Sequence, residues 1–383
     1  MQMKTLFRLA SAFSVVTLSL LWSGCARSSA KPSLAEQRPE PPKAARLDRE
    51  LLLTYHTANG HVKTARSVSD WNKRRAEIIN GMQEVMGHLP GPTKRVALDM
   101  QVHERIDCGT YDRFLISYAA EPGSRVPAYL CVPKDTLAGK FKAPAVLCLH
   151  PTDNNIGHQV VVGLGGRQNR AYAHELAVRG YVTLSPSYPL LAKYQPDIKA
   201  LGYESGTMKA IWDNIRGLDL LETFSFVQTR RGFGAIGHSL GGHNAVYTSV
   251  FDERIKVIVS SCGLDSYVDY YGGKEANWHP EKGWCQTRYM LKLADYRGHL
   301  QDIPFDFHEL VGALAPRHVL IIAPLKDSNF RADSVDRVAT AAREVFKLHG
   351  HESRLQIEHP DCDHDFPTEM RQQAYELFDR VLR

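Results

Sequence analysis

One glycine-framed serine offers the clearest chemistry in this chain. Residues 237–241 read Gly-His-Ser-Leu-Gly, which fits G-x-S-x-G, the pattern of a serine on a sharp turn from a strand into a helix. An apolar run precedes the segment, and helix-compatible residues from Asn244 to Tyr247 follow it. Small residues two before and two after the serine let the backbones pass closely in such a turn. We therefore predict Ser239 as a nucleophile; the alternative is a glycine-rich turn with an incidental serine.

A serine hydroxyl needs a base to take its proton, and the base needs a carboxylate that orients it. After a turn of this kind the partners follow in the order serine, acid, histidine, with the acid after a late strand. The apolar run Val319 to Ala323 is such a strand, and Asp327 lies in the loop that follows it. We predict Asp327 as the acid. Asp265 is the reserve candidate, and capping of the next helix is the alternative role for a loop aspartate.

Two histidines near the C-terminus compete for the role of base. His359 directly follows the predicted strand 354–358, where the edge of the sheet would hold it, whereas His364 stands just before the last helix. We predict His364 as the base that takes the proton of Ser239 and later gives it to a leaving alcohol. These three residues would cleave a carboxylic ester through an acyl-enzyme. The alternative is a solvated acidic loop.

The reaction also needs hydrogen-bond donors where negative charge develops on the substrate oxygen. The backbone N–H of Leu240, directly after the nucleophile, is one predicted donor. The second should come from the loop that begins at His150. Pro151 has no N–H to give, so we predict the N–H of Thr152 as the second donor.

Alternating apolar runs and helical segments indicate the scaffold that holds these residues. The expected strands are 128–132, 144–149, 181–185, 232–236, 256–260, 318–323 and 354–358, and the expected helices are 68–86, 169–179, 206–228, a helix from 240, 332–348 and 367–382. Nearly all-apolar strands between helices predict an α/β protein with a doubly wound, mostly parallel sheet. We assign 47–383 to one domain with an N-terminal helical lead-in and a cap-like insertion at 262–308.

The N-terminal residues resemble an export signal. Lys4 and Arg8 flank an uncharged, largely apolar run that ends near Trp22, which is too short and one-sided for an ordinary membrane span. Residues 21–25 read Leu-Trp-Ser-Gly-Cys, similar to a bacterial lipobox in which Cys25 is lipidated. We predict a signal peptide at 1–25 and a flexible tether at 26–46. The protein would be a periplasmic or cell-envelope lipoprotein on a membrane tether, and otherwise secreted.

The placed residues give the chain a resemblance to the α/β-hydrolase superfamily. Within it, the helix that contains Trp71 to Arg75 and ends before His88-Leu89-Pro90 is similar to the lead-in of the bacterial branch with acetyl xylan esterases and dienelactone-hydrolase-like proteins. True dienelactone hydrolases use a cysteine nucleophile, whereas this chain has Ser239. The resemblance therefore implies an esterase that uses serine. Glucuronoyl esterases are also similar, but carry Arg after the nucleophile where this chain has Leu240.

Composition limits the other classes of function. The net charge of +5 comes from 47 basic and 42 acidic residues, which do not cluster with aromatics as a nucleic-acid groove requires. We find no convincing metal-ligand spacing and no phosphate-binding fingerprint, so we expect no metal and no cofactor. The expected partner is a small-molecule or carbohydrate ester. A prolyl-oligopeptidase-like peptidase and a non-catalytic binding protein are the competing interpretations.

Two further features leave alternatives open. Six cysteines follow Cys25; we expect Cys131 and Cys148 to be free buried thiols, and Cys262 with Cys285 is a candidate disulfide. The insertion carries aromatic residues that could form a wall for a substrate or could simply pack the insertion itself: Tyr267, Tyr270, Tyr271, Trp278, Trp284 and Tyr289.

Overall fold

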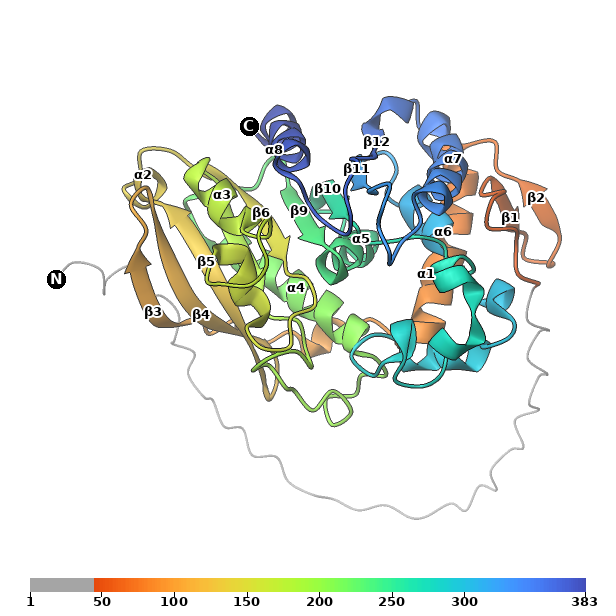
Figure 1. Ribbon diagram of the computed structural model, residues 1–383, viewed down its shortest axis with the longest axis horizontal. Helices are drawn as coiled ribbons and strands as arrows, with labels where there is room; N and C mark the ends of the chain where they lie inside the picture. Colours follow the sequence, from red (N-terminus) through yellow and green to blue (C-terminus); the bar gives the residue numbers. More distant parts are fainter. Residues whose placement is uncertain (1–44) are drawn as a thin grey trace, which may run out of the picture. The chain divides into compact units, whose positions relative to one another are not determined.

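The computed structural model describes residues 45–383 (Figure 1). The predicted signal peptide, Cys25 and nearly all of the predicted tether lie outside the described residues. Arg46, which the sequence analysis placed at the end of the tether, contacts the folded domain through an ion pair with Glu309 at 2.6 Å. A short hairpin of β1 (Thr54–His56) and β2 (Val62–Thr64) follows.

A ten-stranded sheet forms the centre of the described domain. Its strand order is β12-β11-β10-β9-β6-β7-β5-β4-β3, with the short β8 beside β6. The chain runs parallel from β7 through β6, β9, β10 and β11 to β12, and antiparallel from β7 through β5 and β4 to β3. The strands are β3 (Gln101–Asp107), β4 (Tyr111–Glu121), β5 (Ser124–Pro133), β6 (Ala143–Leu149), β7 (Val182–Pro186), β8 (Val227–Gln228), β9 (Phe233–His238), β10 (Ile255–Ser261), β11 (His318–Ile322) and β12 (Leu355–Glu358).

Helices cover both faces of the sheet, which explains why its central strands are apolar throughout. One face packs on α3 and α8, and the other on α4, α5 and α7 (Figure 1). The helices are α1 (Val68–Met86), α2 (Lys134–Leu137), α3 (Tyr172–Val178), α4 (Gly206–Thr223), α5 (Leu240–Phe251), α6 (Phe307–Gly312), α7 (Ala332–Leu348) and α8 (Thr368–Leu382). This architecture is the α/β-hydrolase fold, as predicted.

Two predicted helices were several residues too long. The segment 169–179 is helical only over Tyr172–Val178. The segment 206–228 is helical only to Thr223, because the chain turns at Phe224 and Val227 then pairs with Ala143 of β6. Strands β3 and β4, which extend the sheet on the antiparallel side, were not predicted from the sequence. Every residue of β3 is exposed and the strand carries charge at Glu104 and Arg105, so it has no apolar run to detect.

Residues 262–308, the predicted insertion, contain short 3₁₀ turns between β10 and α6. These are η4 (Tyr270–Gly273), η5 (Glu275–Asn277), η6 (Gly283–Cys285), η7 (Leu291–Tyr296) and η8 (Leu300–Asp302). The fully buried carboxylate of Asp306 fixes the start of the segment. It accepts hydrogen bonds from the Ser266 hydroxyl at 2.6 Å and from the Tyr267 N–H at 3.0 Å. The insertion is therefore tied to the base of α6 at both ends.

The N-terminal lead-in is held by buried ion pairs with α6. Glu309 has a fully buried side chain and accepts from Arg46 at 2.6 Å and from Arg74 of α1 at 2.9 Å. Arg49 pairs with Asp306 in the same cluster. Removing one partner of a buried pair typically costs about 3–5 kcal/mol, so this cluster fixes the lead-in against the domain.

Two expectations about the chain can be compared with the described residues. All six cysteines among them are free thiols, so the candidate Cys262–Cys285 disulfide is absent from the described structure, and Cys131 and Cys148 are buried. Burial raises the pKa of the Cys131 thiol to about 12. Within residues 45–383, no helix has the length and apolar character needed to cross a membrane.

Candidate active site

Ser239 occupies a strained turn between β9 and α5. Its backbone has φ 55° and ψ −121°, a conformation that side-chain-bearing residues rarely adopt. The Ser239 N–H donates to the Ser261 carbonyl of the neighbouring strand at 2.8 Å, and its own carbonyl accepts from the Gly242 N–H at 2.8 Å. These bonds hold the turn and leave the hydroxyl at the carboxyl end of the sheet.

The two glycines of the motif are required by close backbone contacts. A Cβ on Gly237 would lie 2.1 Å from the carbonyl carbon of Gly241, and a Cβ on Gly241 would lie 1.9 Å from the carbonyl oxygen of Leu149. Real Cβ atoms do not approach other atoms so closely, so any side chain would displace the turn. The predicted steric reason for G-x-S-x-G therefore holds at both positions.

Asp327 and His364 lie together after the carboxyl ends of β11 and β12. The Asp327 carboxylate and His364 Nδ1 are 2.8 Å apart, and the aspartate side chain is almost fully buried. The other carboxylate oxygen accepts from the N–H groups of Asn329 at 2.7 Å and Phe330 at 3.2 Å. The backbone thus holds the carboxylate so that it fixes the histidine ring.

The His364 ring lies on the same side of the sheet as Ser239. Its centroid is 4.8 Å from that of His238, the residue before the nucleophile, and 6.0 Å from that of Phe330, which lines one cavity with Ser239. Among residues 45–383, no hydrogen bond joins the Ser239 hydroxyl to His364. Catalytic hydrogen bonds are often long without substrate and shorten when it binds, so this geometry fits a site at rest.

His359 and Asp265, the alternatives to His364 and Asp327, make other contacts. His359 lies under the edge of the sheet, where Nδ1 contacts the Ala323 carbonyl at 2.7 Å and Nε2 contacts Asp336 at 3.0 Å. Asp265 accepts from the Arg331 N–H at 3.2 Å. Burial raises the pKa of Asp265 well above its usual range, which favours the neutral acid. Neither residue contacts the His364 ring through a hydrogen bond within the described chain.

The predicted oxyanion donors border the same cavity as the nucleophile. Leu240 is the first residue of α5, where backbone N–H groups have no partner inside the helix. Thr152 lines the cavity, and its hydroxyl is 2.9 Å from the hydroxyl of Tyr289. His150 positions this loop, because it contacts the Pro151 carbonyl at 2.8 Å and accepts from the Tyr188 N–H at 2.9 Å.

Burial keeps the ring of His150 in its neutral state. It lowers the pKa of His150 to about 4, so the ring is neutral near pH 7 and can accept through Nε2. From the sequence, His150 was named only as the start of the loop, and this role was not predicted. Its place directly after the apolar run 144–149 was the available signal.

The structure divides the predicted aromatic set into two groups. Tyr267 and Trp278 are fully buried and pack the insertion itself. The other four line the cavity at Ser239: Tyr270, Tyr271, Trp284 and Tyr289. His243 and Phe330 complete this wall and were missed by the sequence analysis, since nothing in their local sequence distinguishes them from core residues. Packing of the insertion therefore holds for Tyr267 and Trp278, and a substrate wall stays a prediction for the four residues at the cavity.

His243 is a neutral part of the cavity wall. Its ring packs on Trp284 with centroids 4.6 Å apart. Burial lowers its pKa to about 3. The residues that line the cavity carry no Lys, Arg, Asp or Glu side chain, so the described wall offers an uncharged surface.

One group of side chains near the nucleophile has donor atoms suited to a metal. Atoms of His238, Cys262 and His364 lie within 4.8 Å of one another. Each has another contact: His238 with the Ser261 hydroxyl at 3.2 Å, the Cys262 thiol with the Asp365 carbonyl at 3.2 Å, and His364 with its carboxylate. Burial raises the pKa of Cys262 well above its usual range, which favours the protonated thiol over a metal ligand. We assign no metal to this group.

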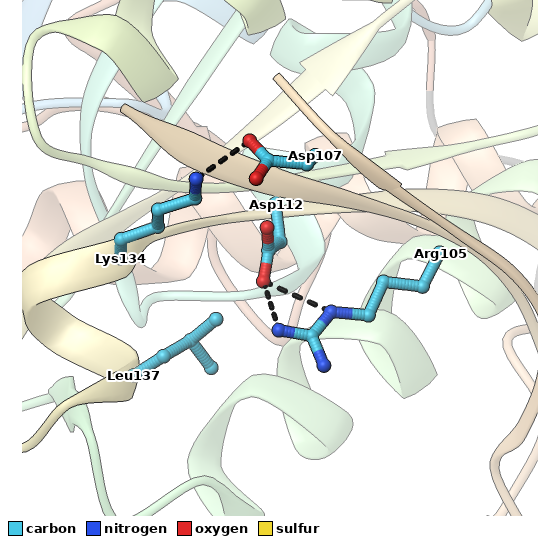
Figure 2. Close-up of a pocket in the computed structure, with 5 residues that line it drawn as sticks. All are labelled: Arg105, Asp107, Asp112, Lys134 and Leu137. Carbon is cyan, nitrogen blue, oxygen red and sulfur yellow. Dashed lines mark hydrogen bonds and ion pairs between the residues drawn. The ribbon is translucent and has the colours of Figure 1, made fainter. Parts of the chain in front are cut away.

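A second hollow, on the antiparallel side of the sheet, lacks such chemistry (Figure 2). Its charged residues pair with one another. Lys134 Nζ lies 2.6 Å from the Asp107 carboxylate, and Arg105 Nε donates to Asp112 at 3.0 Å. The residues that line this hollow include no Ser, Cys or His, and both of its carboxylates are in ion pairs.

The fold and these residues define a serine hydrolase with the α/β-hydrolase architecture, and comparisons with known proteins agree. The fungal glucuronyl esterase family matches residues 201–350. A Bacillus subtilis protein described as a hydrolase, YtaP, is 25% identical over 286 residues, which cover 72% of this chain and 89% of that protein.

Solved structures show the same fold. A glucuronoyl esterase from Solibacter usitatus superposes with a TM-score of 0.67 at 19% identity, covering 89% of this chain and 99% of that one. A Bacteroides fragilis protein described as an acetyl xylan esterase gives a TM-score of 0.53 at 16% identity, covering 76% of each chain. The predicted superfamily is confirmed, and the predicted enzyme class, a serine carboxylic-ester hydrolase, agrees with these relatives.

Proposed function

We propose that this protein hydrolyses carboxylic esters of carbohydrates, and that it removes short acyl groups such as acetyl. The observation that carries the proposal is the Asp327–His364 pair, held at 2.8 Å beside the strained turn of Ser239. A buried carboxylate that orients a histidine next to a half-buried serine that borders a cavity is the arrangement that activates serine for acyl transfer.

Each group has one task in the proposed reaction. The Ser239 hydroxyl attacks the ester carbonyl while His364 Nε2 takes its proton, and Asp327 stabilises the resulting imidazolium. The N–H groups of Leu240 and Thr152 donate to the oxyanion. His364 then protonates the leaving alcohol, and the acyl-enzyme forms. Water, deprotonated by the same histidine, releases the acid and restores the serine.

The cavity at the nucleophile supports a small, neutral acyl group. Its volume is about 150 Å³, below the roughly 300–1,000 Å³ that is common for ligand pockets. Tyr270, Trp284 and Phe330 form an uncharged aromatic wall, against which the apolar faces of a sugar can pack. A long acyl chain has no described space in this cavity.

A second candidate is hydrolysis of glucuronate esters. It is favoured by the match of the fungal glucuronyl esterase family to residues 201–350, a range that includes the nucleophile. Leu240 argues against it, because the resemblance to that family implies Arg at this position. In an acetylated sugar the sugar supplies the alcohol of the ester, whereas in a glucuronate ester it supplies the acyl group. Substrates of the two kinds therefore distinguish the two candidates.

A substrate panel tests the proposed function. We expect the enzyme to hydrolyse acetylated xylo-oligosaccharides and p-nitrophenyl acetate, with kcat/KM lower by about tenfold or more for p-nitrophenyl octanoate, since the acyl chain exceeds the cavity. A higher kcat/KM for methyl glucuronate than for acetyl esters would favour the second candidate. Cleavage of a chromogenic prolyl peptide without ester turnover would indicate a peptidase, and folded protein inactive on the whole panel would indicate a binding protein.

We propose in addition that the mature protein is a lipoprotein of the cell envelope, anchored through Cys25. The support is the basic start, the apolar run and the Leu-Trp-Ser-Gly-Cys segment at 21–25. Expressed in a bacterium with labelled palmitate, the full chain should carry label and fractionate with membranes, whereas the Cys25→Ala variant should carry none. Equal labelling of both would refute the anchor, and an unlabelled, soluble wild type would indicate simple secretion.

A further inference from the structure

A cleft rich in basic side chains lies at the edge of the sheet opposite the nucleophile. Its residues come from segments that lead into parallel strands: Arg230 and Arg231 precede β9, Lys256 is in β10, Arg317 precedes β11 and Arg354 precedes β12. The catalytic residues instead follow the other ends of these strands. Six residues of β9 span about 20 Å, so the cleft is separate from the active site.

The cleft has a strong excess of positive charge. Arg75 joins the five residues above, and Glu253 is the one carboxylate among the residues that line the cleft. Glu253 lies 3.2 Å from Arg75, and its side chain is 72% exposed. A single solvated carboxylate cannot balance six cations.

Part of this charge has a structural explanation. In this fold helices run antiparallel to the parallel strands, so the negative ends of their dipoles gather at this edge. Arg317 donates to the carbonyls of Ser249 at 2.6 Å and Asp252 at 3.3 Å, near the end of α5. Arg75 donates to the Val250 carbonyl at 2.9 Å, and Arg354 to the Pro316 carbonyl at 2.9 Å. These three arginines hold the scaffold.

The other three cations have no such task. Arg230, Arg231 and Lys256 are exposed, and within residues 45–383 their side chains make no ion pair and no hydrogen bond. Unpaired neighbouring cations repel one another, which disfavours their clustering without a ligand. These side chains offer hydrogen-bond donors and no acceptors, so they suit an anion.

The floor of the cleft also has unpaired polar atoms. The Nε1–H of Trp71, a residue that is 1% exposed, has no hydrogen-bond partner among the described residues, and neither has Nε2 of His349. Both residues line the cleft. Buried polar atoms are normally paired, but these two are closed off from solvent, so the case for an anion rests on the exposed cations.

The surroundings narrow the class of anion. None of the large hydrophobic side chains that are exposed on residues 45–383 lines the cleft, whereas a membrane-binding face needs such residues to insert. Trp71 is too buried to stack on a nucleic-acid base. The cleft volume of about 680 Å³ suits a short segment of a soluble polymer.

We propose that this amino-edge cleft binds the carboxylates of an acidic, uronate-bearing polysaccharide and so holds the enzyme on its polymer. Arginine matches a carboxylate with two parallel hydrogen bonds, and the Lys256 ammonium adds a third exposed cation to Arg230 and Arg231. The choice of a polysaccharide rests on the proposed function; the anionic character rests on the cleft alone.

Binding of polygalacturonate to the full chain, without measuring turnover, tests the proposal. The variant Arg230→Glu/Arg231→Glu/Lys256→Glu should bind about tenfold or more weakly at low salt, and the wild-type affinity should fall as salt rises. The matched control is Lys63→Glu/Lys142→Glu/Lys199→Glu, which makes the same charge change at exposed residues elsewhere. It should bind like wild type.

Hydrolysis of p-nitrophenyl acetate separates this proposal from the proposed function. Both triple variants should keep wild-type kcat/KM, since the cleft is remote from Ser239. Unchanged polygalacturonate affinity in the cleft variant would overturn the proposal, as would an equal loss in the control variant. Cleft-dependent binding to vesicles of phosphatidylglycerol, with none to polygalacturonate, would also overturn it in favour of a membrane contact. If wild type and both variants hydrolysed no ester but bound polygalacturonate as expected, the proposed esterase function would be refuted and the cleft proposal would stand.

Discussion

Replacing Ser239 with Ala should lower kcat for p-nitrophenyl acetate by about 10⁴–10⁶-fold, because no other group can form the acyl-enzyme. The residual rate should come from the oxyanion donors and from substrate binding. KM should change little, since the hydroxyl contributes to the reacting state more than to binding. Steady-state kinetics measure the loss, and a fluorophosphonate probe followed by mass spectrometry should label the peptide that contains Ser239 in wild type only.

The matched control is Ser249→Ala in α5, the helix that follows Ser239. The Ser249 hydroxyl is buried and has no hydrogen-bond partner among the described residues, so its loss should leave both kcat and stability close to wild type. Ser239→Ala should also relieve none of the turn strain, because alanine at φ 55° is strained as well. Retention of more than about a tenth of wild-type kcat by Ser239→Ala would exclude this residue as the nucleophile.

Much of the site could be predicted because its signals are local. The G-x-S-x-G turn is defined by five neighbouring residues, and the glycines are needed for contacts that the turn itself creates. The candidate acid and base were then placed by strand order, since a loop after each late strand must open on the same edge of the sheet. The helices predicted at roughly 68–86 and at 332–348 match the structure, because each has a long amphipathic pattern.

What the sequence could not provide depends on distant contacts. Tyr267 and Tyr270 have similar local sequences, yet one packs the insertion and the other lines the cavity. The basic cleft is assembled from residues that precede separate strands, so no stretch of sequence shows an unusual charge. β3 was missed for a related reason, as an exposed edge strand needs no apolar run.

Replacing Asp327 with Asn should lower kcat by roughly 10⁴-fold, and this prediction decides between the two candidate acids. Asparagine keeps the size of the side chain and can still accept from the N–H groups of Asn329 and Phe330. Its amide would face His364 Nδ1 with a donor, which favours the wrong ring tautomer and removes the charge that stabilises the imidazolium. Thermal unfolding should show a folded variant, so the loss can be assigned to the chemistry.

Asp265→Asn is the matched control, because it makes the same change in a buried aspartate close to the site. Burial raises the pKa of Asp265 well above its usual range, and a neutral acid lacks the charge needed to stabilise an imidazolium. Its oxygen can still accept from the Arg331 N–H after the change, so kcat should stay within about tenfold of wild type. If Asp265→Asn instead lost as much activity as Asp327→Asn, the two carboxyls would share the role; if it lost more, the acid would be Asp265, and the 2.8 Å contact between Asp327 and His364 would serve only to place the ring.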